Sequence, residues 1–135
     1  MIVVDTSALI GVLVGRPQID ALVARIVGDP DLHAPHLIDV EILDALRRLV
    51  ASTDLSQDRA EDARTDYADL VIARYPHQPL ADRIWELRQT ITAYDAAFVA
   101  LAEALDCPLV TCDRRLGRAV GHRARIEVFQ PEGRK

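Results

Sequence analysis

Lysine, cysteine and aromatic residues are all scarce in this chain, and each scarcity excludes a class of protein. The only lysine is Lys135, at the C-terminus, which excludes a phosphoacceptor signalling domain because such domains place a lysine at a strand end. Cys107 and Cys112 are the only cysteines, which excludes a disulfide-stapled secreted domain, and no second Cys/His pair accompanies them to form a zinc site. With aromatic residues at 4%, the core must be aliphatic.

Long apolar runs and basic charge are limited as well. No apolar run approaches the roughly 20 residues that cross a bilayer, and the N-terminus lacks the basic start of a secretory signal. We therefore predict a cytoplasmic protein with no membrane partner. The chain has 135 residues, of which half are hydrophobic, and its net charge is −5. This length and composition predict one globular domain over 1–129, followed by a C-terminal tail over 130–135. Arginines crowd the segment after Asp113, which favours a local basic patch.

Short apolar segments alternate with helical patterns along the chain. Strands are predicted over residues 2–4, 32–34, 71–73, 108–111 and 126–129, and helices over 7–14, 17–27, 36–51, 57–70, 80–91, 92–105 and 113–120. This alternation predicts an α/β fold in which a parallel sheet is covered by helices on both faces.

The tryptophan and the histidines are expected to have structural roles rather than to form a site. Trp85 is expected to pack at the edge of its helix. The four histidines show no paired metal-ligand spacing and are expected at the surface or in loops. They are His33, His36, His77 and His122.

The opening stretch from Ile2 to Ile10 holds the first candidate site residue. A buried strand ends at Val4 and is followed by Asp5, so the Asp5 carboxylate is expected at the carboxyl end of a strand, where ligands of open α/β sheets bind. Asp5 can equally be the N-cap of the next helix. This stretch alone leaves both interpretations open.

Two further aspartates occupy comparable places. Asp113 follows the fourth predicted strand, and Asp95 lies in the first turn of the helix that begins at Thr92. Each also has a structural interpretation, because Asp113 can be a turn or N-cap residue and Asp95 can complete a capping box with Thr92.

The fourth candidate acid is Glu41, at the border of the apolar stripe of helix 36–51. A solvated border is its structural interpretation. Helical periodicity does not separate Glu41 from Asp39, which lies nearer the middle of the stripe but can serve as a first-turn acid. Both assignments stay open on the pattern alone.

The four acids together suggest a shared chemistry. Carboxylates that converge at strand ends repel one another and raise their pKa values unless a cation neutralises them. Hard oxygen ligands suit Mg²⁺ or Mn²⁺ rather than zinc. A carboxylate-held Mg²⁺ activates water and stabilises charge on a phosphoryl group, which is the chemistry of many nucleases.

Four segments carry a family resemblance. In chain order they are VVDTSALI, LIDVEILDALRRL, TAYDAAFVALAEAL and VTCDRRL. Their order, spacing and combination resemble PIN-domain ribonucleases, specifically the VapC-type toxins of bacterial type II toxin–antitoxin systems, from Ile2 to about Phe129. The resemblance implies a PIN-like three-layer α/β fold, with a short central parallel sheet flanked by helices.

The resemblance also assigns the acids. The family's acidic cluster falls on Asp5, Glu41, Asp95 and Asp113, a choice of Glu41 over Asp39 that periodicity does not make. It implies that Asp5, Asp95 and Asp113 hold Mg²⁺, or Mn²⁺ in its place, directly or through water. Glu41 would then orient or deprotonate the attacking water.

Hydroxyl and basic residues near this cluster are implied to position ligands and substrate. The family's small hydroxyl residue falls on Thr6 or Ser7, and Thr111 matches a hydroxyl position before the last acid. Arg114 and Arg115 are candidates for contact with the RNA backbone, with a solvated helix face as the alternative. Some relatives carry a further acid after the last one; none stands there in this chain, which puts a second metal in doubt.

The function that the resemblance implies is a metal-dependent endoribonuclease toxin. Such a toxin hydrolyses phosphodiester bonds in structured RNA, such as tRNA or rRNA, and is neutralised by a cognate antitoxin that covers the acidic groove. A homodimer formed through helical surfaces is implied too. The alternative is a non-catalytic PIN-like module that binds RNA or a protein, and the presence of all four acids weighs against it.

Overall fold

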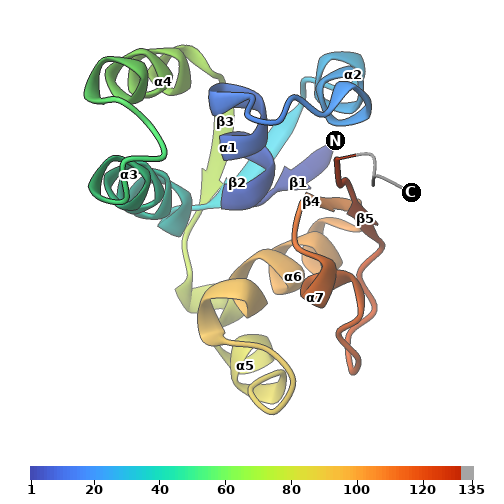
Figure 1. Cartoon of the computed structure of the whole chain (residues 1–135). Coiled ribbons are helices and arrows are strands. Elements are labelled where there is room, and N and C mark those ends of the chain that lie inside the picture. Colours follow the sequence, from blue (N-terminus) through green and yellow to red (C-terminus); the bar gives the residue numbers. More distant parts are fainter. Residues whose placement is uncertain (132–135) are drawn as a thin grey trace.

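Five parallel strands form one sheet in the computed structural model of this chain, in which residues 1–131 are described (Figure 1). The strands are β1 (Ile2–Val4), β2 (Leu32–Pro35), β3 (Ile72–Tyr75), β4 (Leu109–Thr111) and β5 (Ile126–Val128). They lie in the order β3-β2-β1-β4-β5, with Val3 of β1 paired to His33 of β2 and to Leu109 of β4. The predicted α/β class is confirmed.

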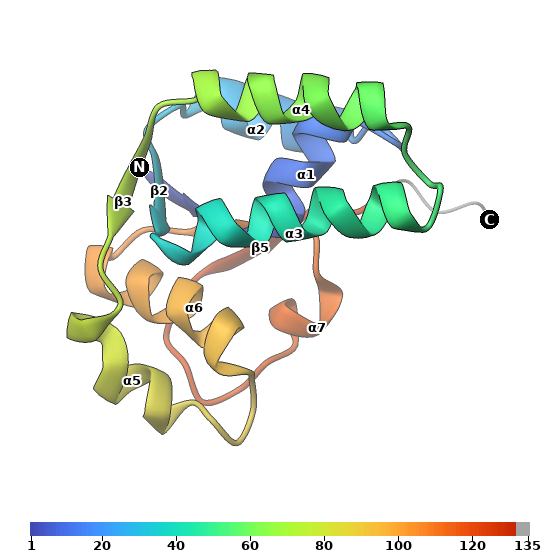
Figure 2. The same ribbon diagram turned by 90° about the vertical axis from the view of Figure 1, so that its left-hand side faces the viewer.

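Helices cover both faces of this sheet (Figure 2). They are α1 (Thr6–Val14), α2 (Asp20–Gly28), α3 (Leu37–Ala51), α4 (Gln57–Asp69), the 3-10 turn η1 (Gln78–Leu80), α5 (Ala81–Glu86), α6 (Ala93–Leu105) and α7 (Arg114–Gly117). Helices α1, α3 and α4 pack together on one side, while α6 packs on β1, β2 and β4 with α5 against it. This is the expected three-layer arrangement.

Local sequence signals explain where the two helices beside the predicted site begin and end. The Asp5 carboxylate accepts the N–H of Ala8 and caps α1, which ends at Gly15 in the left-handed conformation (φ 64°) that glycine adopts without strain. The Thr92 hydroxyl accepts the N–H of Asp95 and caps α6 in the same way. Asp5 is thereby fixed at the N-cap of α1, and Asp95 in the first turn of α6.

Several predicted boundaries are wrong where signals were weak or ambiguous. Helix α2 begins at Asp20, so Pro17 lies before the helix rather than in its first turn. Strand β3 begins at Ile72 and extends to Tyr75, because its partners in the sheet are the residues of β2. The helix predicted over 80–91 is shorter, with α5 ending at Glu86.

Two side chains lie in environments opposite to those predicted. Trp85 is 67% exposed, with the Arg88 guanidinium 4.3 Å from its ring centroid, rather than packed at the helix edge. His33 is 6% exposed within β2, where its ring bonds the Tyr75 hydroxyl at 2.7 Å and the Asp31 carboxylate at 2.9 Å. Because β2 is an interior strand, His33 is buried although its residue type favours the surface.

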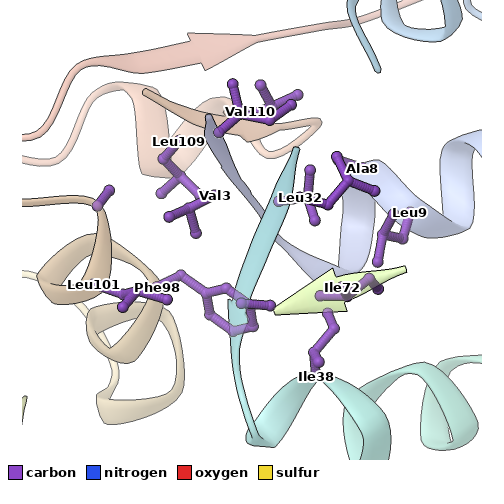
Figure 3. Packing of buried hydrophobic residues seen from close by; sticks show 14 of the residues in the cluster. Val3, Ala8, Leu9, Leu32, Ile38, Ile72, Phe98, Leu101, Leu109 and Val110 are labelled. Carbon is purple, nitrogen blue, oxygen red and sulfur yellow. The ribbon is translucent and has the colours of Figure 1, made fainter. Parts of the chain in front are cut away.

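The core is aliphatic, as predicted, and lies on both faces of the sheet (Figure 3). On one face Phe98 and Leu101 of α6 pack towards the strands, and on the other Leu9 of α1 and Ile38 of α3 do so. The strands are too short to hold a site by themselves. The two helix layers therefore fix the positions of the residues at the carboxyl end of each strand.

Strand order places a crevice at one point of the sheet edge. The chain runs from β1 outward to β2 and β3, then crosses to the other side of β1 to form β4 and β5. Ligands of such sheets bind outside the carboxyl ends of the strands where the order reverses, here between β1 and β4. Asp5 comes directly after β1 and Asp113 comes after β4, so the topology brings both acids to this crevice.

The two ends of the chain differ in how they are held. The Met1 amino group donates to the Asp29 carboxylate at 2.9 Å. The predicted tail begins at Gln130, whose side-chain amide donates to the carbonyl of Cys112; residues 132–135 of that tail lie outside the described residues. Across residues 1–131, no helix combines the length and apolarity needed to cross a membrane.

Candidate active site

An open pocket of about 920 Å³ lies at this crevice, and all four predicted acids line it. Asp5 directly follows β1, and Asp113 lies shortly after the end of β4. Glu41 lies on α3, and Asp95 lies in the first turn of α6. These residues are far apart in the sequence but reach one pocket because of the strand order. The helices that carry them can be followed in Figure 2.

Asp5 is the most deeply placed acid, with 7% of its surface exposed. Its Oδ1 accepts the Ser7 hydroxyl at 2.7 Å and the Ala8 N–H at 2.9 Å, and its Oδ2 accepts the Thr111 hydroxyl. Burial raises the pKa of Asp5 to about 6, and the three hydrogen bonds partly oppose that rise. The two interpretations of Asp5 are therefore compatible, because one carboxylate both caps α1 and lines the pocket.

Thr111 is fully buried behind Asp5 and links the ends of β1 and β4. Besides donating to Asp5, its hydroxyl oxygen accepts the Asp113 N–H at 3.0 Å and lies 3.2 Å from the Ser7 hydroxyl. The predicted positioning residue thus lies outside the pocket lining but orients two acids that form it.

Replacing Thr111 with valine tests this arrangement. Valine keeps the shape but leaves the Asp5 carboxylate and the Asp113 N–H short of a partner, so the free energy of unfolding should fall by about 1–3 kcal/mol. Urea unfolding at neutral pH measures the change. Thr111→Ser keeps the hydroxyl and should lose less. A valine variant as stable as the wild type would show that the hydroxyl does not hold these groups.

The structure separates Glu41 from Asp39, which periodicity could not do. The Glu41 carboxylate lines the pocket and accepts the Thr6 hydroxyl at 2.7 Å. The Asp39 carboxylate instead accepts the Tyr67 hydroxyl at 2.6 Å and two N–H groups of Arg74, both at 2.8 Å. Residues two positions apart on a helix point to different sides, and only the Glu41 side faces the acids.

Asp95 and Asp113 are the other two predicted acids in the pocket lining. Burial and the nearby Asp113 charge raise the pKa of Asp95, and burial together with the Asp95 charge raises the pKa of Glu41. The Asp113 carboxylate caps α7 by accepting the Arg115 N–H at 2.9 Å, so its structural interpretation also holds. The mutual repulsion leaves the pocket in need of a positive charge.

The donor chemistry of this pocket fits Mg²⁺ or Mn²⁺. Its acids offer only hard oxygen ligands. Among residues 1–131, however, no three His, Cys, Asp or Glu side chains converge closely enough to form a ready metal cage. Mg²⁺ keeps several waters and binds through one or two carboxylates, so an open acidic pocket suits a hydrated Mg²⁺.

The other predicted positioning residues divide into two groups. Thr6 and Ser7 both line the pocket, each hydrogen bonded to one of its acids. Arg114 and Arg115 are exposed and do not line it, although an Arg115 N–H group lies 3.5 Å from the Asp113 carboxylate. Their contact with RNA remains a prediction.

Sequence reasoning missed two pocket residues of different chemistry. Arg48 of α3 lines the wall, 67% of its side chain is exposed, and its charge partly offsets the rise in the pKa of Glu41. Tyr94, next to Asp95, lines the pocket and is 63% exposed. The signal for Arg48 was available, because it lies seven residues after Glu41 and so on the same side of α3.

Comparison with known proteins agrees with this fold. The PIN domain family matches residues 2–121. Ribonuclease VapC9 of Mycobacterium tuberculosis is 46% identical over 116 residues, which cover 86% of this chain and 88% of that protein. Ribonuclease VapC1 of the same organism is 40% identical over 129 residues, covering 95% of this chain and 97% of that protein.

A solved structure is similar in fold. It is VapBC2 from Rickettsia felis bound to a DNA fragment from its promoter, with a TM-score of 0.69 and 13% sequence identity. The alignment covers 96% of this chain and 99% of that chain. At this identity the likeness concerns the fold alone.

Proposed function

We propose a specific activity for this chain, which belongs to the PIN-domain family and, within it, to the VapC ribonucleases: metal-dependent hydrolysis of phosphodiester bonds in structured RNA. The observation that carries the proposal is the meeting of Asp5, Glu41, Asp95 and Asp113 in one open pocket. The pKa values of Asp5, Glu41 and Asp95 are raised, and a cation bound between the acids would offset their repulsion.

The three aspartates would hold the cation. Asp5, Asp95 and Asp113 line the pocket at the strand ends, and the Asp5 carboxylate is held by three hydrogen bonds that keep it in place before anything binds. When bound, Mg²⁺ or Mn²⁺ supplies activation of water and stabilisation of the charge that develops on the phosphoryl group. Ser7 and Thr111 keep the Asp5 oxygens oriented for this role.

Glu41 would act on the water. The Thr6 hydroxyl donates a hydrogen bond of 2.7 Å to the Glu41 carboxylate. Burial raises the pKa of Glu41, which makes this carboxylate a better proton acceptor. The water would give its proton to Glu41 as its oxygen forms the new bond to phosphorus. The bond from phosphorus to the leaving ribose oxygen would break, and that oxygen would take a proton from solvent in the open pocket. Arg48 lines the same wall, and its guanidinium would contact a phosphate that flanks the cleaved bond.

Cleavage of a labelled pool of cellular tRNA and rRNA by antitoxin-free protein tests this function. We expect discrete fragments with Mg²⁺ or Mn²⁺ and none with excess EDTA. Asp95→Asn should lower the cleavage rate on the order of 10²- to 10³-fold, because a negative charge that holds the cation is lost. Glu61→Gln, on the exposed face of α4, is the matched control and should cut like the wild type.

Cleavage that persists in EDTA would contradict the metal requirement. A folded protein that binds the RNA pool without cutting it would support the alternative, a non-catalytic PIN-like module. The Asp95→Asn variant must keep the thermal stability of a folded protein for its loss of activity to count, and circular dichroism measures this.

Partners and location follow from the same family. A solved toxin–antitoxin complex from Klebsiella pneumoniae is also similar in fold to this chain, with a TM-score of 0.58 and 18% sequence identity. On this basis we propose a cognate antitoxin for this chain, one that covers the acidic pocket and blocks cleavage. We also propose a homodimer through helical surfaces. Since the proposed substrate is cellular RNA, we propose that the protein acts in the cytoplasm.

A further inference from the structure

Tyr94 is an aromatic side chain with no packing role. In a chain that is only 4% aromatic, the two other tyrosines use their hydroxyls within the fold, since Tyr67 donates to Asp39 and Tyr75 bonds the ring of His33. Tyr94 is 63% exposed, and within residues 1–131 its hydroxyl has no hydrogen-bond partner. The exposed ring is therefore available for contact with a molecule outside the fold.

The ring lies where a substrate would pass. Tyr94 lines the acidic pocket, directly precedes Asp95 and lies one helical turn before Phe98, which also lines it. From α3, Val40 lines the same pocket and is itself 66% exposed. The acids therefore have an apolar rim beside them that comes from α6 on one side and α3 on the other.

The backbone under the ring is held firmly. The Thr92 hydroxyl accepts the Asp95 N–H at 3.2 Å, and the Ala96 N–H donates to the Thr92 carbonyl at 2.8 Å. Tyr94 thus sits in a capped first turn of α6, the helix that packs on the sheet. Because this backbone is held and a tyrosine side chain has only two rotatable bonds, the ring offers a flat apolar face at little cost in conformational entropy.

This geometry suits a nucleobase better than a phosphate. The Tyr94 side chain carries no charge, and the pocket that it lines is rich in carboxylates, so this side chain has nothing to attract the RNA backbone. Arg48 supplies that chemistry further along α3. Bases of single-stranded RNA, once unstacked, bind on the faces of aromatic side chains with little regard to sequence.

We propose that Tyr94 is a substrate-positioning residue that stacks on an unstacked base of the nucleotide next to the phosphate held at the acids. The inference rests on the proposed function for what the acids hold, and deepens it by assigning a residue that positions the RNA. The stacked base fixes the register of the strand, so the phosphate beside it meets the acids.

Binding measured without cleavage tests the stacking directly. All proteins carry Asp5→Asn to stop cleavage, and the probe is a short fluorescein-labelled single-stranded RNA of mixed sequence, followed by fluorescence anisotropy with Mg²⁺. Adding Tyr94→Ala should weaken binding roughly 5- to 100-fold, the range typical for loss of one base–aromatic stack. Tyr94→Phe keeps the ring face and should bind within about twofold of the tyrosine.

A second probe separates base from backbone. The second probe is an oligonucleotide of the same length that keeps the ribose–phosphate backbone but lacks every base. It should bind equally well to the proteins with Tyr94 and with Tyr94→Ala. Trp85→Ala removes an exposed aromatic that does not line the pocket and should leave binding of the mixed-sequence RNA unchanged.

Three results would overturn the proposal. They are binding unaffected by Tyr94→Ala, a loss with Tyr94→Phe as large as that with alanine, and an equal loss with Trp85→Ala. The first shows that the ring does not touch RNA, which leaves contact with a protein as its use. The second assigns the effect to the hydroxyl, and the third to general adhesion of exposed aromatics.

Kinetics in the active protein distinguish this inference from the function on which it rests. With Asp5 restored, Tyr94→Ala should raise KM by about the factor seen in binding and change kcat far less. If the wild type cuts no RNA, the proposed function fails, yet the binding comparison still decides whether Tyr94 stacks on a base.

Discussion

Replacing Asp5 with asparagine should abolish RNA cleavage and at the same time stabilise the metal-free protein. Activity is expected to fall on the order of 10³-fold, because the most deeply placed acid of the pocket loses its charge. The free energy of unfolding at pH 7 should rise by up to about 3 kcal/mol. Few substitutions of a polar residue that is 7% exposed are expected to stabilise a protein.

The sign follows from the pKa of Asp5. Burial raises that pKa from 3.8 to about 6, so the folded protein holds the proton more tightly than the unfolded chain does. As the pH rises from about 4 to about 6 the unfolded chain ionises first, and the folded state loses stability over this window. Each pH unit between the two pKa values corresponds to about 1.4 kcal/mol. Asparagine does not ionise and escapes the loss.

Urea unfolding in EDTA between pH 4 and pH 7 measures the effect. The gap between Asp5→Asn and the wild type should be small at pH 4 and largest near pH 7. Asp95→Asn is the matched control, since Asp95 is less buried and its expected gain is smaller. Equal stability of wild type and Asp5→Asn at pH 7 would mean that the charge of Asp5 costs the fold nothing.

Replacing Glu103 with alanine is expected to destabilise the fold by about 2–3 kcal/mol. The Glu103 carboxylate, only 6% exposed, accepts two N–H groups of Arg83, at 2.7 Å and 2.9 Å, and the backbone N–H of Arg123 at 2.6 Å. It thereby ties α5, α6 and the segment before β5 together. Removing one partner of a buried pair costs about 3–5 kcal/mol, and the value here is reduced because the Arg83 side chain is 26% exposed.

The pH dependence of this effect has the opposite sign to that of Asp5. Hydrogen bonding to Arg83 holds the pKa of Glu103 below its ordinary value of 4.5. Its stabilising contribution is therefore complete above about pH 4.5 and is lost as the pH falls through the lowered pKa. Thermal unfolding of wild type and Glu103→Ala should differ most at neutral pH and converge in acid.

An exposed ion pair provides the control for Glu103. Glu61 pairs with Arg64 at 2.9 Å on α4, but both side chains are more than half exposed, so Glu61→Ala should cost less than about 0.5 kcal/mol. A Glu103→Ala variant no less stable than Glu61→Ala would show that the network contributes nothing beyond a surface pair.

The sequence by itself determined the elements whose causes are local. The strand over Ile2–Val4 and the helix over Gln57–Asp69 follow from apolar runs, caps and periodicity, which act over a few neighbouring residues. The position of Asp5 at a strand end is a local fact of the same kind. Four sequence segments, each a weak signal alone, together indicated the PIN-domain family through their order and spacing. That resemblance also selected Glu41 over Asp39.

Only the tertiary structure decided which side of each helix faces the site. Glu41 and Asp39 lie on one helix, and the packing of α3 against α1 and α4 directs Glu41 to the acids and Asp39 to Arg74. The burial of His33 and the exposure of Trp85 have the same origin, since both depend on neighbours far away in the chain. Periodicity reports that a helix has two sides, while contacts between distant elements determine what each side meets.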